Sequence, residues 1–330
     1  MFYFISFCRN ILRLSVHVIV VRKKALRQAT CYLRNIEQKF SGKFDEATFN
    51  KITKSYSSWL PTVTNSFARL HGSYASKAEQ ERTIHYFICS SVFDNFFDDK
   101  LLTVQQIENI TFNYQHYQPK TFSEKASLYS HLFLLNYIAR KDEYLSVLRK
   151  EFNAQVASLN QFNQNINNEE IQFITFQKGG NAVLMCYYYT DVEGSAEEKN
   201  CWFTLGTLIQ LTNDLFDIYK DLHDGIETLA TRCFEVYELE KIFLRQVKIL
   251  KENIKLLHNT KKQQQNFSTA ISSLYVMGFI ALDNLKKIQA QHNNQLPNLK
   301  TLPRKELIVD MAKLLNIYEG IKYAYKIARI

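Results

Sequence analysis

The chain has 330 residues, enough for one large domain with a full hydrophobic core. Only nine Gly and four Pro occur, a low content of turn-forming residues that favours an all-α protein. The net charge of +9 favours an anionic ligand or surface as a partner. The cysteines at positions 8, 31, 89, 186, 201 and 233 form no CxxC pair, which argues against a zinc site or a disulfide framework and indicates a reducing, cytoplasmic compartment.

The N-terminal segment, residues 1–21, is apolar but interrupted by four polar residues, Arg9, Asn10, Arg13 and His17. A membrane-spanning helix needs about 20 nearly uncharged residues, and a signal peptide has its charge before the apolar run and a small-residue site after it. The segment fits neither. We therefore predict an amphipathic helical extension over residues 1–40, which either lies on a membrane surface or packs as a first helix on the domain.

Helices are predicted at residues 24–40, at 44–60, where Pro61 stops the helix, and at 62–71. Ser76 is the expected N-cap of the next helix, with Glu79 as its capping-box partner. This helix, residues 77–98, ends in a first acidic cluster, Asp94-Asn95-Phe96-Phe97-Asp98. Like charges four residues apart destabilise a helix, and acids near its C-terminal end oppose its dipole. The cluster therefore calls for a compensating charge, most simply a bound metal.

Further helices are predicted at residues 103–116 and 123–163, with breaks near Pro119 and Lys141, followed by a polar loop at 161–168. The helix at 169–189 contains Lys178-Gly179-Gly180-Asn181. Paired glycines cost about 1 kcal/mol each in a helix relative to Ala, and they usually mark a kink or a close backbone approach. The aromatic run that follows, residues 187–189, either stabilises a cation through its ring faces or belongs to the core.

A second acidic cluster lies in a helix predicted at residues 196–221. Asn213, Asp217 and Asp221 are spaced at i, i+4 and i+8, so they share one helix face, and the outer two are about 12 Å apart. Such a strip of oxygen ligands suits Mg²⁺, which often also meets a phosphate. A solvated acidic face is the alternative for either cluster taken alone.

Three more helices are predicted at residues 234–257, 267–291 and 304–330. No internal repeat and no second domain is evident. We therefore predict that residues 41–330 form a single-domain helical bundle.

The two acidic clusters together resemble the metal-binding motifs of class I isoprenoid synthases, the superfamily of terpene cyclases, chain-elongating prenyltransferases and squalene/phytoene synthases. Asp94-Asn95-Phe96-Phe97-Asp98 resembles the aspartate-rich motif, with Asn95 where a second Asp is usual. Residues 213–221 resemble the Asn/Ser/Glu motif of terpene cyclases, with Asp at the Ser and Glu positions. The resemblance covers residues 75–235.

This resemblance implies a helical bundle of the terpenoid synthase type that binds an allylic isoprenyl diphosphate with Mg²⁺, three ions in all. The implied metal ligands are Asp94, Asn95, Asp98, Asn213, Asp217 and Asp221. The implied diphosphate donors are Lys178, Lys220 and Arg232, of which Lys178 is matched by its position near a helix break. The implied reaction releases diphosphate and forms a terpene by cyclisation of the allylic cation.

Other members of the superfamily stay open as alternatives. Residues 210–217 also resemble the second Asp-rich motif of prenyltransferases, and the spacing of Asp217 and Asp221 also occurs in squalene/phytoene synthases. The Gly-Lys-Arg motif of elongating enzymes is not found near the N-terminus, which favours a cyclase.

Two further classes fit less well. A diiron bundle needs Glu-x-x-His pairs, and Glu81 and His85 have the wrong spacing for one. A non-catalytic binding protein would have lost its metal ligands, most of which are present here. The expected partners are the diphosphate substrate, a membrane surface at the N-terminus and a second copy in a homodimer, with no nucleic acid.

Overall fold

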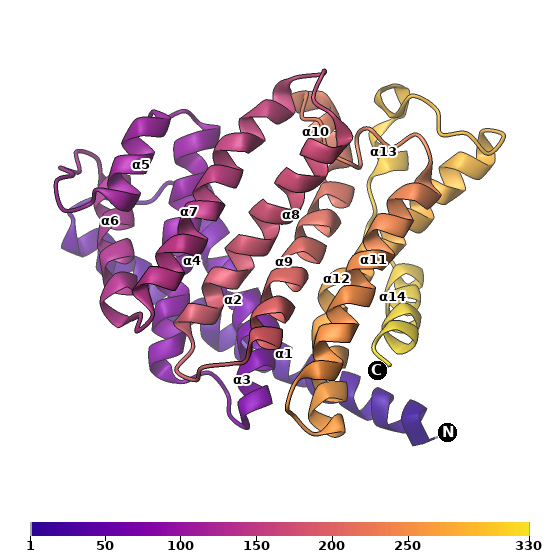
Figure 1. The fold of residues 1–330 in the computed structure, drawn as a ribbon, viewed down its shortest axis with the longest axis horizontal. Coiled ribbons are helices and arrows are strands. Elements are labelled where there is room, and N and C mark those ends of the chain that lie inside the picture. The colour runs from indigo at the N-terminus through magenta and orange to yellow at the C-terminus, as the bar shows by residue number, and fades with distance from the viewer. Residues whose placement is uncertain (1, 330) are drawn as a thin grey trace. The chain divides into compact units, whose positions relative to one another are not determined.

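A computed structural model describes residues 2–329, and every regular element in that range is a helix or a helical turn (Figure 1). This confirms the predicted all-α fold class. The chain divides into two compact units. We call residues 11–145 with 188–193 the α4 unit, and residues 1–10, 146–187 and 194–330 the α9 unit. The predicted division into an extension, residues 1–40, and one domain, residues 41–330, stays a prediction.

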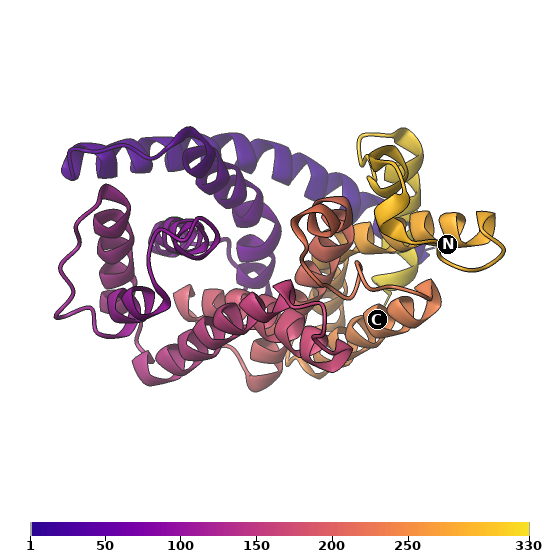
Figure 2. The same ribbon diagram turned by 90° about the horizontal axis from the view of Figure 1, so that it is seen from above.

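The first element, α1, is one long helix, Phe2–Lys39, and much of its length is visible in indigo in Figure 2. Within the α4 unit it is fixed by a buried face that includes Ala25, Ala29 and Leu33. The spacing of four residues places these side chains on one side of the helix. None of the helices in the described part of the chain combines the length and the apolar composition that crossing a bilayer requires.

The next helices of the α4 unit are joined at a proline. Helix α2, Glu46–Trp59, runs into a π-helical turn, Leu60–Thr64, and then into α3, Asn65–Ala68, and a 3-10 turn, Arg69–His71. The prediction that Pro61 stops the helix is therefore wrong. Proline lacks an N–H, but the wider turn lets the Asn65 N–H donate to the carbonyl of Leu60, so the helical path continues.

Helix α4, Lys77–Asp98, carries the first acidic cluster and begins as predicted. The Ser76 side chain accepts from the Glu79 N–H, and the Glu79 carboxylate accepts from the Ser76 N–H. The helix packs against α2 and α6. The remaining helices of this part of the chain are α5, Val104–Phe112, α6, Phe122–Tyr137, and α7, Lys141–Ala157, which crosses from the α4 unit into the α9 unit.

The α9 unit is built around α9, Ala196–Phe216, which packs against α8, α11 and α12. Trp202, Leu205 and Leu208 on α9 are fully buried. The surrounding helices are α8, Asn168–Met185, α10, Ile218–Asp224, α11, Val236–Leu256, α12, Lys261–Gln291, α13, Arg304–Leu307, and α14, Leu314–Ile327. Short 3-10 turns occupy Ser158–Phe162, Cys186–Tyr189 and Leu299–Thr301.

Two predicted helices of this unit are each divided in two. The helix expected at residues 196–221 bends at Asp217, whose φ of −91° and ψ of 5° lie outside helical values. The backbone bonds continue across the bend, because Asp217 N–H donates to Asn213 and Asp221 N–H donates to Asp217, both at 2.8 Å. The helix expected at residues 304–330 is split into α13 and α14.

Candidate functional site

The second acidic cluster is positioned by an unusually close crossing of α8 and α9, which lie side by side in Figure 1. A Cβ atom added at Gly179 would lie 2.6 Å from the carbonyl oxygen of Gly206, closer than real contacts allow. At Gly180 it would lie 2.5 Å from the Phe203 ring. The glycine pair therefore allows the close backbone approach of α8 and α9, which is one of the two alternatives that the sequence predicts. A break at residues 178–181 is excluded, because α8 is continuous from Asn168 to Met185.

This crossing places Lys178 of α8 near Asp214, a buried acid of α9. The Asp214 carboxylate accepts a hydrogen bond from the Gln210 amide at 2.8 Å and one from the Thr175 hydroxyl at 3.3 Å. Burial raises the pKa of Asp214 to about 6, against the lowering effects of Gln210, Lys178 and Thr175. The Asp214 carboxylate is therefore surrounded by protein donors and a lysine ammonium rather than by bulk water.

The predicted ligands of the second cluster differ in exposure. Asn213 and Asp217 are exposed, whereas Asp221 on α10 is buried, at 8% exposure. Burial and, to a smaller extent, the neighbouring carboxylates of Asp214 and Asp217 together raise the pKa of Asp221 to about 7, against the lowering effect of Lys220. Three acids, Asp214, Asp217 and Asp221, therefore interact electrostatically at the end of α9.

Arg232, predicted as a diphosphate donor, lies in the turn after α10 and already has partners. Its guanidinium donates to the backbone carbonyl of Ile166 and lies 3.8 Å from the Glu227 carboxylate. The Gln161 side chain also contacts this turn, because its amide donates to the Glu227 carbonyl at 2.9 Å. Arg232 thus has a structural role that the sequence did not indicate. Its role as a diphosphate donor stays a prediction.

The first acidic cluster is engaged by α2. The Asp94 carboxylate forms an ion pair with the Lys51 ammonium at 2.8 Å, and both side chains are partly exposed. The Asn95 amide donates to the Thr48 hydroxyl at 2.7 Å. Asp98 is exposed at the last position of α4. The compensating charge that this cluster calls for is thus supplied to Asp94 by a lysine of the chain itself.

The two acidic clusters belong to different units of the chain. Asp94, Asn95 and Asp98 belong to the α4 unit, and the other predicted site residues belong to the α9 unit. Within residues 2–329 no group of three or more His, Cys, Asp or Glu side chains is close enough to hold a metal ion in the present conformation. The resemblance to class I isoprenoid synthases also implies that the two clusters face each other across a helical bundle, and this stays a prediction.

Sequence reasoning missed three residues that shape these sites, namely Lys51, Thr175 and Asp214. Asp214 stands beside Asn213 in the motif, and Thr175 precedes Lys178 by three residues, so both lie where helical periodicity would have placed them near the site. Lys51 lies 43 residues before Asp94 and carries no local signal.

The aromatic run after α8 belongs to the core. Tyr187 and Tyr189 are almost fully buried, and their hydroxyls are engaged, since Tyr187 donates to the Gly194 carbonyl at 2.9 Å and Tyr189 lies 3.1 Å from the Tyr144 hydroxyl. Of the two interpretations of this run, burial in the core is the one the structure supports.

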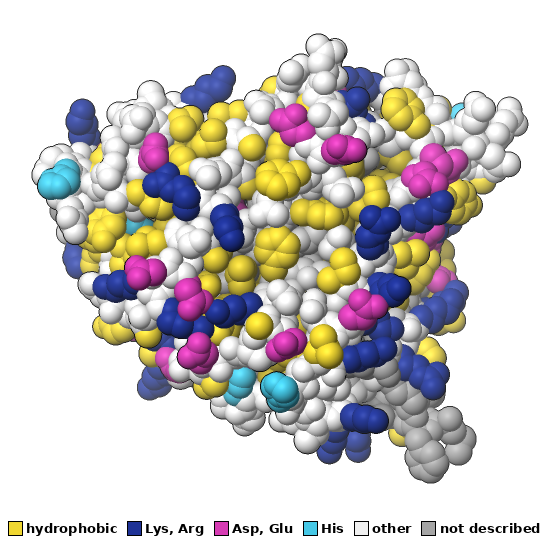
Figure 3. Space-filling view, viewed as in Figure 1, with side chains coloured by type: hydrophobic (Ala, Val, Ile, Leu, Met, Phe, Trp, Pro, Cys, Tyr) yellow, Lys and Arg dark blue, Asp and Glu magenta, His cyan; other side chains and the backbone are white. Residues whose placement is uncertain are grey.

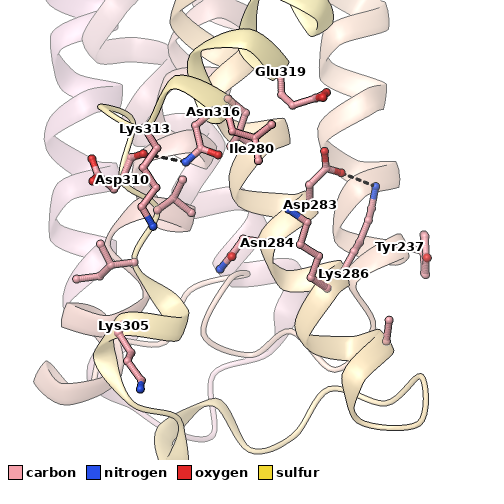
Figure 4. A pocket seen from close by; sticks show the side chains of 15 residues that line it. Tyr237, Ile280, Asp283, Asn284, Lys286, Lys305, Asp310, Lys313, Asn316 and Glu319 are labelled. Atoms are coloured by element: carbon pink, nitrogen blue, oxygen red, sulfur yellow. Dashed lines mark hydrogen bonds and ion pairs between the residues drawn. The ribbon is translucent and has the colours of Figure 1, made fainter.

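A cavity of about 680 Å³ lies elsewhere in the α9 unit, between α12 and the segment that leads into α14 (Figure 4). None of the predicted site residues lines it. Its charges are partly balanced within it, because the Lys286 ammonium lies 3.4 Å from the Asp283 carboxylate and 2.5 Å from that of Glu240. It is a separate feature from the acidic clusters.

Comparisons with known proteins add no family to this description. No protein-family model matches the chain, and searches of curated proteins and of solved structures find no significant match.

Proposed function

We propose that this protein is a Mg²⁺-dependent terpene synthase that ionises an allylic isoprenyl diphosphate and releases diphosphate. The proposal combines the resemblance of the two acidic motifs to class I isoprenoid synthases with the helical fold class. It includes the finer assignment of the fold to the terpenoid synthase type.

One observation carries the ionisation step of the proposal, the interaction of Asp214, Asp217 and Asp221 at the end of α9 beside Lys178. Two of these acids are buried and their pKa values are raised, so in the ionised state their mutual repulsion is poorly screened. In a solvated acidic face the carboxylates would be exposed, whereas Asp214 and Asp221 are buried. A cation that binds the ionised form relieves this repulsion.

The residues of the second cluster fit Mg²⁺ by their chemistry, because they are carboxylate and amide oxygens, the ligands that this ion prefers. Its three acids would have to move closer together to hold the ion. Asn213, Asp217 and Asp221 would hold it. The residues of the first cluster fit only after a change, since Asp94 is paired with Lys51. Binding of a metal to Asp94 requires Lys51 to leave, which is a small cost because exposed ion pairs contribute at most about 1 kcal/mol.

Bound Mg²⁺ would supply charge neutralisation and Lewis-acid activation of the diphosphate leaving group. The chain supplies the remaining donors. Lys178, on the α8 side of Asp214, and Lys220, next to Asp221, carry ammonium groups that can donate to phosphate oxygens. Arg232 would join them only by giving up its present contact with Ile166.

A second candidate function is prenyl transfer to another isoprenoid, and Asp214 favours it. In the resemblance to terpene cyclases Asp214 has no role, whereas the second Asp-rich motif of prenyltransferases includes the positions of Asp214 and Asp217. Asp214 is buried and acts electrostatically on Asp221. The two candidates share the ionisation step and differ in whether a second substrate is required.

The test is to incubate the purified protein with allylic diphosphates of several chain lengths, with and without Mg²⁺, and to measure released diphosphate and extracted hydrocarbon. Asp217→Asn and Asn213→Ala are the test variants. Glu169→Gln, an exposed acid in the first turn of α8, is the matched control. We expect Mg²⁺-dependent release that is lost in the two test variants and kept in the control.

The products separate the candidates. A cyclic product from one diphosphate alone supports the synthase, and activity that appears only when a homoallylic diphosphate is added supports the transferase. Absence of diphosphate release under every condition would overturn both enzymatic proposals. Mg²⁺ binding without release would then leave a metal-dependent binding protein.

A further inference from the structure

The charge and exposure of α1 distinguish it from the rest of the chain. No Asp or Glu occurs in residues 1–36, although the whole chain has 32 acidic residues. The face of the molecule seen in Figure 3 shows the ordinary pattern instead, with Asp and Glu side chains lying among the Lys and Arg. Residues 253–282 also lack Asp and Glu, so what marks α1 is the combination of this lack with exposed aliphatic and basic side chains.

The outward face of α1 in the α4 unit is apolar over two turns. Its exposed aliphatic side chains are Leu12 (67%), Val16 (54%), Ile19 (70%) and Val20 (63%). The spacings of three, four and seven residues place them on one side of the helix. Large aliphatic side chains this exposed and this close together usually mark an interaction surface.

Basic side chains border this apolar face and continue along it. Arg13, Arg22, Lys23, Lys24 and Arg27 are all exposed. Within residues 2–329 none of the five forms an ion pair. Their charge is thus available to a partner outside the chain.

The opposite face of α1 packs against the α4 unit. The His17 ring stacks on Tyr74 with centroids 4.8 Å apart, and its Nε2 lies 3.1 Å from the Asn65 amide nitrogen. Farther along, the Tyr56 hydroxyl donates to the Gln28 side chain at 3.1 Å. A helix anchored in this way presents residues 12–27 outward without further folding.

We propose that this outward face of α1, residues 12–27, docks on a membrane surface that contains anionic phospholipids. The aliphatic side chains enter the boundary between headgroups and acyl chains, and the basic side chains contact the lipid phosphates and carboxylates. The charge complementarity selects this occupant, because a second copy of α1 would bring two strongly basic faces together. The proposal does not depend on the proposed enzymatic function.

The experiment is sedimentation of the full-length protein with vesicles of phosphatidylcholine alone or with added phosphatidylserine. We expect binding only to the vesicles that contain phosphatidylserine, and release at high salt because screening weakens exposed charges. Arg22→Gln/Lys23→Gln/Lys24→Gln should weaken binding roughly a hundredfold, since each basic residue contributes about a factor of five. Leu12→Ser/Ile19→Ser should also reduce binding strongly.

Matched controls change the same kinds of side chain elsewhere. Lys261→Gln/Lys262→Gln/Lys300→Gln removes three exposed lysines, and Leu101→Ser removes an exposed leucine of the α4 unit. Both should bind as the original protein does. All of these side chains are exposed, so circular dichroism should show an unchanged fold in every variant.

Three outcomes would overturn the proposal. The first is no binding to vesicles that contain phosphatidylserine, or equal binding to both kinds of vesicle. The second is a dimer in analytical ultracentrifugation that Leu12→Ser/Ile19→Ser dissociates while vesicles are not bound, which would identify a second copy as the partner. The third is equally tight binding of DNA that the apolar substitutions leave unchanged, which would identify a polyanion.

Discussion

Gly179 of α8 and Gly206 of α9 meet at the point where the two helices cross, and neither position has room for a methyl group. A Cβ atom at Gly206 would lie 2.9 Å from the carbonyl carbon of Gly179 and closer still to its oxygen. Because backbone atoms of a buried helix cannot easily move aside, a substitution must push the helices apart. This spacing also sets the distance between Lys178 and Asp214.

Gly206→Ala is therefore expected to destabilise the α9 unit by about 2–3 kcal/mol, although Ala is the better helix former. Gly320→Ala in α14 is the control, since its nearest neighbour would be a flexible Ile280 methyl group at 3.4 Å. It should stabilise by about 0.5–1 kcal/mol. The chain has one Trp in each unit, so the fluorescence of Trp202 in a Trp59→Phe background reports chemical unfolding of the α9 unit. Equal effects of the two substitutions would contradict the close crossing.

Two buried histidines should make the α4 unit sensitive to acid. Burial lowers the pKa of His85 to about 3 and that of His131 to about 4. His85 is fully buried, stacks on Phe133 at 3.9 Å, and neither of its ring nitrogens has a hydrogen-bond partner. Unfolded histidine has a pKa near 6.5, so between pH 6.5 and 3 the unfolded state binds more protons than the folded state. The stabilising effect is complete above pH 6.5 and is lost as the pH falls.

The expected loss is about 2–3 kcal/mol for each histidine between pH 6.5 and 4. His85→Phe keeps the stacked ring and removes the proton acceptor, so it should flatten the dependence of unfolding free energy on pH. His116→Phe, which changes an exposed histidine, should leave the dependence unchanged. Unfolding of the α4 unit is followed by Trp59 fluorescence in a Trp202→Phe background. A His85→Phe protein that loses stability as steeply as the original would argue against a neutral buried imidazole.

The ion pair between Lys51 and Asp94 should compete with metal at the first acidic cluster. Removal of the ammonium in Lys51→Met frees the Asp94 carboxylate, so the concentration of Mg²⁺ that gives half-maximal diphosphate release should fall several-fold. Stability should change by less than about 1 kcal/mol, because the pair is exposed.

Lys54→Met is the control for Lys51→Met, since Lys54 is an exposed lysine on the same helix without a partner on Asp94. It should leave the requirement for Mg²⁺ unchanged. A Lys51→Met variant that needs more Mg²⁺, not less, would mean that Lys51 assists the proposed reaction. That outcome would place Lys51 among the donors to diphosphate.

The sequence was sufficient where local chemistry decides the structure. Ser76 and Glu79 form the predicted capping box, and the glycine pair at 179–180 marks a real close approach. It was insufficient where distant residues decide. Pro61 does not stop its helix, because the chain continues through a π-helical turn at Leu60–Thr64. Lys51 reaches Asp94 only through the tertiary packing of α2 against α4. Helical periodicity predicted the face that Asn213 and Asp217 share, but not that their neighbour Asp214 is buried beside Thr175.

Mg²⁺ should stabilise the α9 unit through the second acidic cluster. A ligand that binds only the folded state stabilises it by mass action, by about 2.7 kcal/mol at a hundred times its dissociation constant. The affinity for Mg²⁺ should rise as the pH increases from 6 to 8, because Asp221, with a pKa of about 7, must lose its proton to bind a cation.

Asp221→Asn should reduce both the stabilisation by Mg²⁺ and its dependence on pH, whereas Glu169→Gln should preserve them. Trp202 fluorescence during chemical unfolding, with and without Mg²⁺, measures the effect. Equal stabilisation of the original protein and Asp221→Asn would mean that the metal binds elsewhere, and the proposed role of the second cluster would fail.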